Sequence, residues 1–421
     1  MPDCVLGIDV GTSGVRVAAV DLKGRPLSFS TAALPPPSVI NGHVMQDADE
    51  WWHAVSLALD RLERSQLNIL AIAIDGTSGT ILPIDQNGRP LGLASMYNDV
   101  ADQDAVSRVN HVASETTAAR GQTSPLARAL PSLHASNSVI HQADWIAGHF
   151  SGHYQRTDEN NALKTGYDPV LRRWPDWMDK LDFDLALLPE VVPAGQTFGF
   201  IVPAVADRFH LSRETQIIAG TTDGCAAFLA SGARDHGDGV TSLGTTLTIK
   251  LLSQTPIFAP HYGIYSHRIG DDWLAGGASN TGGAVLLHYF SVDRMMELEQ
   301  AIAPDHPTGY NYYPLLKQGE RFPINDPALP PRLDPRPAED AIFLQALFEG
   351  IASIEALAYA RLAELGATPL TTLRSVGGAA RNRAFTAIRA RSLKVPMWDV
   401  LSDHAAIGVA RLAWRGLGYA A

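Results

Sequence analysis

A short polar turn between two apolar, strand-like runs limits what this sequence can fold into more than any other feature. In the stretch LGIDVGTSGVRVAAVD, residues 6–21, apolar residues lead up to Asp9, and alternating apolar residues resume after Gly14. This pattern predicts a β-hairpin whose turn carries Gly-Thr-Ser-Gly. Glycines with small hydroxyls expose backbone N–H groups, and such a concave turn can hold a phosphate. An ordinary hairpin turn is the alternative interpretation.

The same pattern returns in the second half of the chain. The stretch VTSLGTTLTIKLLS, residues 240–253, is again an apolar strand, a Gly-Thr turn and an alternating strand. The chain has 421 residues, which is longer than one typical core, so we expect two domains of roughly 200 residues each. Glycines and charges break the pattern in GARDHGDGV, residues 232–240. We therefore expect one domain at residues 1–234 and another at residues 235–421.

Composition narrows the classes of partner. The formal net charge of -11 argues against a nucleic-acid surface, which needs clustered Lys and Arg. Cys4 and Cys225 lie too far apart in the sequence to predict a disulfide framework, and the histidines show no metal-binding spacing. The N-terminus lacks the pattern of a secretion signal, and no segment approaches the ~20 apolar residues that span a bilayer. We expect a soluble, cytoplasmic protein with no membrane partner.

Strands and helices alternate along the chain, which predicts an α/β fold. Residues 47–65 predict a helix with acidic residues in its first turn, and residues 68–76 predict the strand that follows. The apolar face of that helix would consist of Trp52, Val55, Leu59 and Leu62. In the second half, residues 341–365 predict a long core helix, and residues 373–393 predict a strand, a glycine turn and a helix. The proline-rich residues 323–340 predict a surface connection.

Two common nucleotide-binding motifs are absent from the sequence. No Gly-Lys-Ser/Thr occurs, which excludes a P-loop, and no G-x-G-x-x-G opens a helix after the first strand, which argues against a Rossmann dehydrogenase. The remaining candidates are the two hairpin turns, residues 11–13 and 244–246. If these turns face one another across a cleft between two lobes, they could hold a triphosphate between them.

Together with the residues around them, these turns resemble the FGGY family of carbohydrate kinases. The opening DVGTSGVR is similar to the family's first phosphate motif, with Asp9, Thr12 and Arg16 in place. The stretch AGTTDGCAAFLASGA is similar to the segment that carries the catalytic aspartate, SLGTT to the second phosphate turn, and GGAARNRAF to the adenosine motif. The resemblance covers nearly the whole chain. It implies a two-lobed actin/hexokinase-like (ribonuclease H-like) α/β fold with a cleft between the lobes.

The sequence departs from the family pattern where a sugar would bind. Family members commonly have Trp-Asn-Asp followed by Arg, whereas MYNDVAD has Tyr97 before Asn98 and Asp99 and lacks the Arg. The stretch DGTSGT places Thr77 and Ser78 where xylulokinases tend to carry Gln-Met-His. The chain is also shorter than most members. These features resemble the compact ribulokinase and xylulokinase-like members of cyanobacteria and plants.

The resemblance implies an ATP-dependent kinase that phosphorylates the terminal hydroxyl of a ketopentose. It favours D-ribulose over D-xylulose, because the Gln-Met-His pattern is missing. Asp223 would accept the proton of the sugar hydroxyl, and Mg²⁺ would be held by Asp9 and Asp223 through water. As alternatives, Asp223 could cap a helix and Asp9 could bond its own backbone in a turn. At the level of function, an actin-like ATPase without a sugar substrate is the alternative.

Two sets of candidate binding residues follow. In the adenosine motif, Asn382 offers both a donor and an acceptor to a purine edge, and Phe385 is either a packing partner of the base or a core residue. The candidates for ATP are Gly11, Thr12, Ser13, Arg16, Gly244, Thr245, Gly378, Ala379, Asn382 and Phe385. The candidates for the sugar are Asp9, Thr77, Ser78, Asp223 and Asn98. A surface loop is the alternative interpretation at Asn98.

Overall fold

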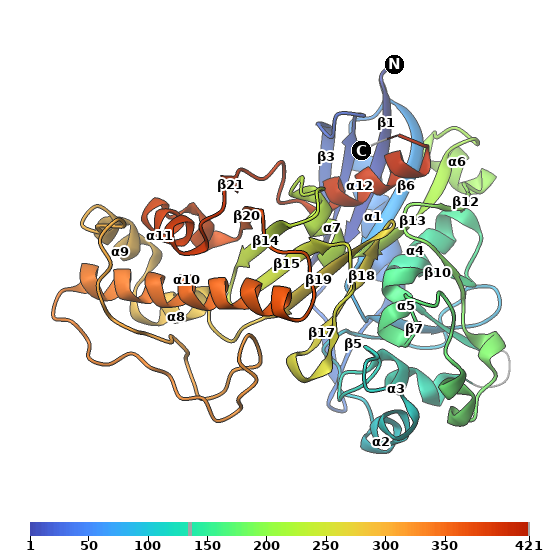
Figure 1. The fold of residues 1–421 in the computed structure, drawn as a ribbon. Coiled ribbons are helices and arrows are strands. Elements are labelled where there is room, and N and C mark those ends of the chain that lie inside the picture. Colours follow the sequence, from blue (N-terminus) through green and yellow to red (C-terminus); the bar gives the residue numbers. More distant parts are fainter. Residues whose placement is uncertain (134–136, 420–421) are drawn as a thin grey trace. The chain divides into compact units, whose positions relative to one another are not determined.

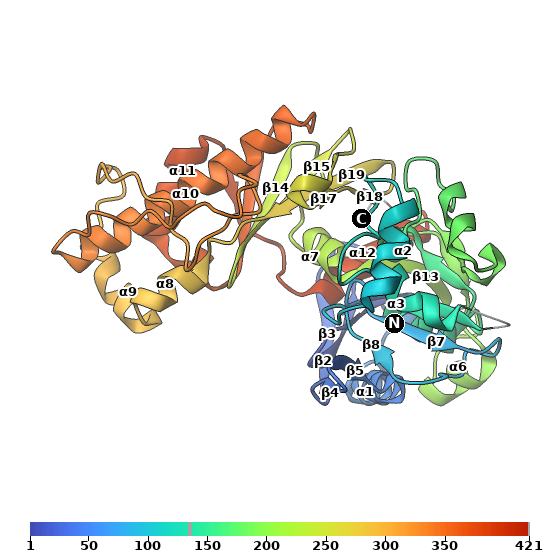
Figure 2. The same cartoon turned by 90° about the horizontal axis from the view of Figure 1, so that it is seen from below.

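A computed structural model describes residues 1–133 and 137–419, and within these limits the chain divides into two units. Unit 1 holds Met1–Ala230, the short segment His267–Asp271 and the chain from His404 onward. Unit 2 holds Ser231–Ser266 and Asp272–Asp403. Figures 1 and 2 show the elements of both units from two sides.

The central sheet of unit 1 has the strand order β12-β13-β6-β1-β2-β3. The first three strands of the chain form antiparallel hairpins, as the opening pattern predicts; β6 pairs with β1 in parallel, and β13 pairs with β6 in parallel. The bounds are β1 Asp3–Val10, β2 Gly14–Val20, β3 Pro26–Ala33, β6 Asn68–Gly76, β12 Thr197–Phe200 and β13 Gln216–Thr222. Parallel strands bring their carboxyl ends to one edge, so β1, β6 and β13 end side by side.

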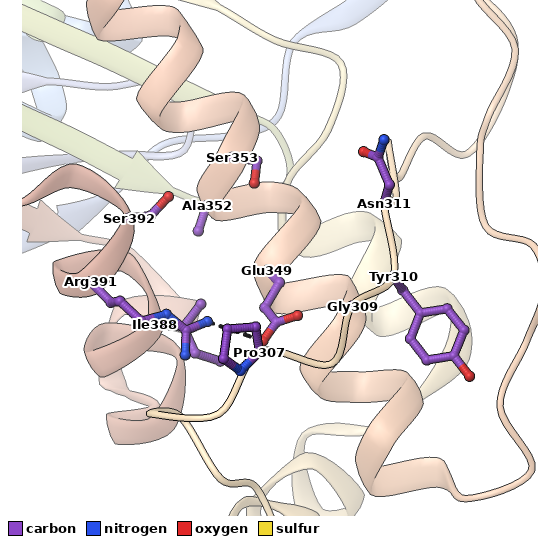
Figure 3. Close-up of a pocket in the computed structure, with 10 residues that line it drawn as sticks. All are labelled: Pro307, Gly309, Tyr310, Asn311, Glu349, Ala352, Ser353, Ile388, Arg391 and Ser392. Carbon is purple, nitrogen blue, oxygen red and sulfur yellow. Dashed lines mark hydrogen bonds and ion pairs between the residues drawn. The ribbon is translucent and has the colours of Figure 1, made fainter.

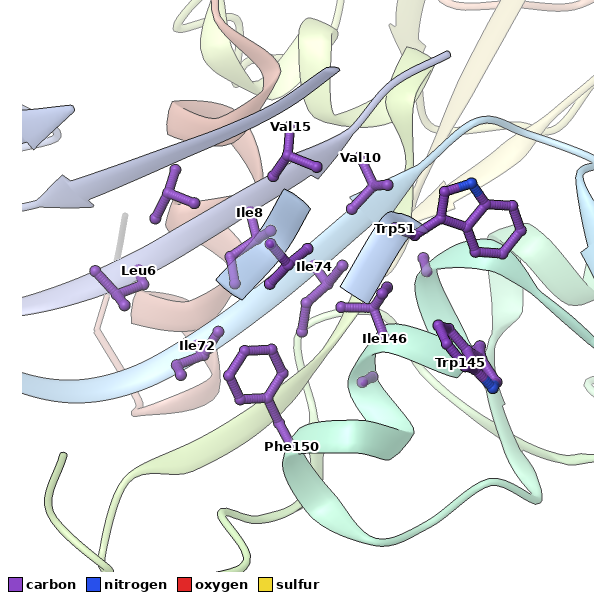
Figure 4. Packing of buried hydrophobic residues seen from close by; sticks show 14 of the residues in the cluster. Leu6, Ile8, Val10, Val15, Trp51, Ile72, Ile74, Trp145, Ile146 and Phe150 are labelled. Carbon is purple, nitrogen blue, oxygen red and sulfur yellow. The ribbon is translucent and has the colours of Figure 1, made fainter. Parts of the chain in front are cut away.

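Alternation along β1 sends its side chains to two different layers. Leu6, Ile8 and Val10 enter an apolar core with side chains of helices α1 (Ala48–Arg61) and α4 (Gln142–Ser151), as Figure 4 shows. On the other face, helix α12 (Ala405–Gly416) passes so close that a Cβ on Gly7 would lie 1.8 Å from the carbonyl oxygen of Ala406. Only glycine permits this approach.

The remaining elements of unit 1 surround this sheet. A second sheet has the order β4-β5-β8-β7-β9, and β10 pairs with β11. The strands are β4 Ser38–Ile40, β5 His43–Gln46, β7 Ile81–Ile84, β8 Ala94–Ser95, β9 Ser138–His141, β10 Arg156–Asp158, β11 Glu190–Val192 and β18 His267–Ile269. The helices are α2 Gln103–Val112, α3 Pro125–Ala129, α5 Glu159–Thr165, α6 Pro203–Phe209 and α7 Asp223–Ala230, with 3-10 turns at Leu130–Ser132, Asp176–Leu181 and Leu185–Leu187.

Unit 2 repeats the central motif of unit 1. Within this unit the sheet order is β19-β15-β14-β20-β21, with β14 antiparallel to β15 and parallel to β20. The strands are β14 Asp238–Leu243, β15 Leu247–Ser253, β16 Phe258–Ala259, β17 Ile264–Tyr265, β19 Asp272–Ala278, β20 Thr372–Val376 and β21 Met397–Trp398. The helices are α8 Gly283–Tyr289, α9 Val292–Glu299, α10 Asp340–Glu364 and α11 Arg383–Leu393, with 3-10 turns at Pro260–Tyr262 and Gly378–Arg381. The second hairpin is therefore confirmed.

Helix α10 confirms the long core helix predicted at residues 341–365, with bounds that differ by one residue at each end. It has 25 residues, and by length and composition it passes as a candidate membrane span with a mean hydropathy of 1.5. In the structure 67% of that window is buried, with side chains such as Leu347 and Ile351 in the core of unit 2. Burial in a protein core accounts for the same hydropathy.

The structure differs from two further expectations. Trp51 is fully buried and Trp52 only partly, because the buried positions of α1 begin at Ala48 and recur through Trp51, Val55 and Leu59. The two units also do not coincide with the continuous ranges 1–234 and 235–421. The chain from His404 onward packs in unit 1, since α12 covers the central sheet there.

Candidate functional site

Three aspartates lie at or just after the carboxyl ends of neighbouring strands of the unit 1 sheet. Asp9 lies near the end of β1, directly beside Asp75 of β6 in the parallel register. Thr221 of β13 lies beside Asp75 in turn, and Asp223 follows two residues later as the first residue of α7. The sheet topology therefore gathers these acids at one edge, as expected for the carboxyl ends of parallel strands.

A bulge in β13 helps to place Asp223. The register of β13 against β6 shifts between Ile218 and Thr221, and a Cβ on Gly220 would lie 1.6 Å from the carbonyl oxygen of Ile74. Glycine at this position lets the two backbones approach, and the bulge then turns the chain into α7. Asp223 is half-buried, and its Oδ1 accepts a hydrogen bond of 2.6 Å from the backbone N–H of Gly224.

Arg16 balances part of the charge of Asp9. Its Nη1 donates to Oδ2 of Asp9 at 3.1 Å, across the antiparallel pairing of the two residues in β1 and β2. Burial raises the pKa of Asp9, Arg16 lowers it, and the nearby charge of Asp223 raises it again. Burial is the largest of these effects, so the pKa of Asp9 lies above its usual value. The ion pair with Asp9 therefore accounts for the position of Arg16 without a contact to phosphate.

Asp75 is a site residue that the sequence analysis missed. Its side chain is fully buried, and neither carboxyl oxygen has a hydrogen-bond partner when both acids are ionised. Burial, followed by the charges of Asp9 and Asp223, raises the pKa of Asp75 well above the usual value of 3.8. A protonated Asp75 can donate to Asp9 and removes the cost of a third buried charge. The repeated sequence IDxGTSG and IDGTSGT was the available signal.

The first hairpin turn presents small polar residues beside these acids. The backbone N–H of Gly11 donates to the carbonyl oxygen of Gly14 at 3.0 Å, which closes the turn. Thr12 is half-buried and Ser13 is exposed. Gly14 is required here, because a Cβ would lie 2.8 Å from the carbonyl oxygen of Ala32.

The turn after β6 is held from beneath by α4. Gln142, the first residue of α4, accepts two hydrogen bonds from Thr77 through the same side-chain oxygen. The hydroxyls of Thr77 and Thr80 are 2.7 Å apart, and the hydroxyl of Ser78 is buried without a partner. Thr77 is therefore engaged within the turn. Gln142 was missed by the sequence analysis because it lies 65 positions away from Thr77.

Arg128 of α3 is a second residue of this region that the sequence did not reveal. Its guanidinium donates to the carbonyl oxygens of Gly79 and Met96, so it joins the turn after β6 to the loop after β8. Burial lowers its pKa to about 10.

Asn98 and Asp99 are neighbours in the chain but differ in exposure. Asn98 is exposed, in agreement with the surface-loop alternative. Asp99 is 3% exposed and accepts from the backbone N–H of Val44 at 3.0 Å and from the hydroxyl of Ser95 at 2.7 Å. Its carboxylate thus fixes the loop to β5 and β8.

In unit 2, glycine-rich segments pack on the second hairpin turn. The backbone N–H groups of Gly283 and Ala284, at the start of α8, donate to the carbonyl oxygens of Gly244 and Thr245 at 2.8 and 3.1 Å. A Cβ on Gly377 would lie 2.7 Å from the carbonyl of Leu243, at a φ of 94°. Two segments far apart in the sequence therefore meet at this turn through positions that require glycine.

The adenosine motif begins α11. Gly378 is exposed with open space around it, and Ala379 is half-buried. The side-chain oxygen of Asn382 caps α11 by accepting from the backbone N–H of Phe385 at 2.8 Å, which leaves its amide nitrogen for a ligand. Phe385 is 1% exposed and stacks on Phe348, so its ring belongs to the core and not to a base-binding surface.

A separate hollow of about 330 Å³ lies between α10, α11 and residues 307–311 of unit 2 (Figure 3). An ion pair between Arg391 and Glu349 occupies one side of it at 3.1 Å. None of the predicted ATP-binding residues lines this hollow. It is therefore distinct from the turn region of unit 2.

The acids of unit 1 suit a loosely held divalent cation. In residues 1–133 and 137–419, no group of three or more His, Cys, Asp or Glu forms a metal cage. Mg²⁺ usually keeps several waters and binds through one or two carboxylates plus substrate phosphates. Asp9 and Asp223, which interact electrostatically, provide such a pair.

Comparison with known proteins agrees with this architecture. The N-terminal domain of the FGGY family of carbohydrate kinases matches residues 4–125, and the C-terminal domain of the same family matches residues 239–417. A xylulose kinase of Lactococcus lactis subsp. lactis is 25% identical over 259 residues, which cover 58% of this chain and 52% of that kinase. An autoinducer-2 kinase of Yersinia enterocolitica is 24% identical over 461 residues, covering 99% of this chain and 87% of that protein.

A solved structure shows the same fold. The crystal structure of a xyloylose kinase from Brucella ovis has a TM-score of 0.87 and 22% identity, and the match covers 99% of this chain and 91% of that one. The expected α/β, two-lobed actin/hexokinase-like fold is thereby confirmed. Because the two family domains together match most of its length, the chain belongs to the FGGY family of carbohydrate kinases.

Proposed function

We propose that this carbohydrate kinase transfers the γ-phosphate of ATP to the terminal hydroxyl of a ketopentose, with D-ribulose as the preferred substrate and D-xylulose as the alternative. The observation that carries the proposal is the half-buried Asp223, which stands beside Asp9 at the edge of the sheet next to turn 11–13. Kinases of this family use ATP, generally with Mg²⁺.

Asp223 is the proposed general base. A sugar hydroxyl is a weak nucleophile at neutral pH, and a carboxylate that accepts its proton accelerates transfer by typically ~10²–10⁴-fold. Asp223 is the most exposed of the three acids, whereas Asp9 and Asp75 are 6% and 0% exposed. It can therefore receive a substrate proton without rearrangement of the sheet.

Asp9 is the proposed partner of the cation. Its bond to Arg16 keeps the carboxylate oriented, and a protonated Asp75 beside it supplies a donor without adding charge. Asp9 and Asp223 would hold Mg²⁺ through water, and the cation would neutralise charge on the phosphates during transfer. In unit 1, Thr12 and Ser13 would donate to phosphate oxygens, and Gly11 would let the phosphate approach the backbone of the turn.

The proposed contacts of unit 2 are with the rest of the nucleotide. The turn at Gly244 and Thr245 would hold phosphate, and Gly378 and Ala379 would allow the adenosine to approach the backbone. The amide nitrogen of Asn382 would donate to the purine edge. Phe385 is left out of this set, because its ring lies in the core.

The choice of sugar rests on the turn after β6. Thr77 and Ser78 occupy the positions where xylulokinases tend to carry Gln-Met-His, which favours D-ribulose. Of the three similar proteins described above, two are named xylulose or xyloylose kinase and one autoinducer-2 kinase, at 22–25% identity. The assay must therefore compare these substrates directly.

The test is ADP release by the full-length protein with ATP and Mg²⁺, in the presence of D-ribulose, D-xylulose, other ketopentoses, polyols and aldoses, and in a blank without sugar. We expect D-ribulose to give the highest kcat/KM. A higher kcat/KM for D-xylulose would select the alternative. If no sugar raises the rate above the blank, the ketopentose proposal fails, and ATP turnover without sugar would favour the actin-like ATPase activity.

A further inference from the structure

Gln142 makes an unusual pair of contacts beneath the turn formed by residues 76–80. The backbone N–H of Thr77 donates to Oε1 of Gln142 at 2.9 Å, and the hydroxyl of Thr77 donates to the same oxygen at 2.8 Å. Gln142 is 0% exposed. Because the backbone N–H can only donate, the side-chain amide must keep its oxygen toward Thr77.

These contacts fix the direction of a chain of hydrogen bonds. Since the hydroxyl proton of Thr77 goes to Gln142, the 2.7 Å contact between the hydroxyls of Thr77 and Thr80 must use the proton of Thr80. The Thr80 hydroxyl in turn accepts from the backbone N–H of Tyr97 at 3.1 Å. The donors therefore run from Tyr97 through Thr80 and Thr77 to Gln142, and Thr77 has only a lone pair left for a ligand.

Two buried polar atoms at the same turn and its support lack a partner. In the part of the chain that the structure describes, Nε2 of Gln142 and the hydroxyl of Ser78 are buried without a hydrogen-bond partner. Leaving such groups unpaired destabilises a fold, and an apolar side chain of similar shape would avoid that cost. The oxygen of Gln142 is used by Thr77, whereas Nε2 of Gln142 and the hydroxyl of Ser78 remain for a further partner. The arrangement points to a role in binding.

We propose that Gln142 is a positioning residue for the sugar, and that it acts by holding Thr77 as a hydrogen-bond acceptor for a sugar hydroxyl. This inference rests on the proposed function, because it takes turn 76–80 as part of the sugar site. From its place in α4, Gln142 fixes the direction in which the hydroxyls of the turn donate. It does not take part in the phosphate transfer itself. Its loss would weaken sugar binding and leave ATP binding, which depends on turn 11–13 and on unit 2, nearly unchanged.

The test is Gln142→Met in the full-length protein, assayed by ADP release with D-ribulose and D-xylulose. We expect the sugar KM to rise at least tenfold while the KM for ATP stays within twofold. Gln142→Glu retains an oxygen that can accept from Thr77, so at least a threefold recovery of the sugar KM is expected. An unchanged sugar KM in Gln142→Met, or an equal rise in both KM values, would overturn the proposal.

Gln46→Met provides a matched control. Gln46 is also a buried glutamine of unit 1, but it bonds to the indole N–H of Trp51 and the carbonyl oxygen of Pro35. It should lower the melting temperature without raising the sugar KM. A tenfold rise in the sugar KM of Gln46→Met would show that loss of any buried amide is sufficient, and would overturn the specific role of Gln142.

If Gln142→Met does not fold, a second variant tests whether this chain of hydrogen bonds affects sugar binding. Thr80→Val removes the hydroxyl that donates to Thr77, and a rise of at least threefold in the sugar KM is expected. An unchanged sugar KM in Thr80→Val would contradict the directed chain of hydrogen bonds. A wild-type protein that no sugar stimulates refutes the proposed function itself, whereas an active wild type with an unaffected Gln142→Met refutes only the role of Gln142.

Discussion

In unit 1, β1 lies between antiparallel β2 and parallel β6, and in unit 2, β14 lies between antiparallel β15 and parallel β20. The strands ahead of the two Gly-Thr turns can therefore be matched residue by residue. Where Asp9 faces Asp75 in unit 1, Ser242 faces Val376 in unit 2.

The two units share one strand arrangement but carry different residues at the matched positions. The edge of unit 1 carries acids that can move a proton and attract a cation, whereas the matched residues of unit 2, Ser242 and Val376, are uncharged. Unit 2 instead has glycines, among them Gly283 and Gly377, pressed against its turn. From this comparison we expect substitutions in unit 1 to affect the chemical step and substitutions in unit 2 to affect nucleotide binding.

The largest effect is expected from Asp223→Asn. Asparagine keeps the shape of the side chain but cannot accept the sugar proton as a base, so sugar-dependent kcat should fall by at least ~100-fold. The affinity for ATP, measured by calorimetric titration, should stay within about threefold of the wild type. Near-normal turnover would instead assign Asp223 to capping of α7, and the distinction between the two units would lose its main support.

A smaller effect is expected at Gly377 of unit 2. An alanine there must adopt a φ of 94° and place its Cβ 2.7 Å from the carbonyl of Leu243. Positive φ and the contact together should destabilise unit 2 by about 1–3 kcal/mol. Displacement of turn 244–246 should raise the KM for ATP by roughly tenfold.

Gly378→Ala is the matched control, because a Cβ at Gly378 meets nothing within 4 Å. It should change the free energy of unfolding by less than about 0.5 kcal/mol. Thermal melting and the KM for ATP report both effects. Equal destabilisation by the two alanines would show that the close approach at Gly377 is not what fixes the turn.

The next effect concerns the proton on Asp75. Folding raises the pKa of this carboxyl above 3.8, so the folded state binds the proton more tightly than the unfolded state. The resulting stabilisation is fully present below about pH 3.8 and is lost as the pH rises through the folded pKa. Asp75→Asn, which has no proton to lose, should therefore gain in melting temperature relative to the wild type as the pH rises above about 3.8.

Asp75→Leu separates the hydrogen bond from the charge. It also lacks a titrating group, but unlike asparagine it cannot donate to Asp9. Asp75→Asn should therefore retain more sugar-dependent turnover than Asp75→Leu. If the melting temperature of the wild type and that of Asp75→Asn change in parallel with pH, Asp75 does not carry the proton.

These residues also show what could be predicted from the sequence. The hairpins, the glycine turns and Asp223 at the start of a helix depend on residues that are adjacent in the chain, and all were predicted. Asp75 was missed because it follows an apolar run, and because the residue that it pairs with, Asp9, lies more than sixty positions away in the sequence. The same holds for Gln142 beneath Thr77 and for α12 on the sheet of unit 1. Local patterns predict elements, whereas burial and pairing between distant segments decide which polar groups meet.

The smallest effect is expected from Arg16→Gln, at a position matched by Thr248 in unit 2. The Arg16 side chain is 41% exposed, so its ion pair with Asp9 should contribute less than about 1 kcal/mol to stability. Arg16 nevertheless lowers the pKa of Asp9, and its loss should raise that pKa further. The acidic limb of the pH profile of kcat/KM should then move to higher pH, whereas Arg16→Lys should preserve most of the wild-type profile. An unmoved limb would mean that the charge of Asp9 is not required for turnover, and would weaken the contrast between the acids of unit 1 and the uncharged matched residues of unit 2.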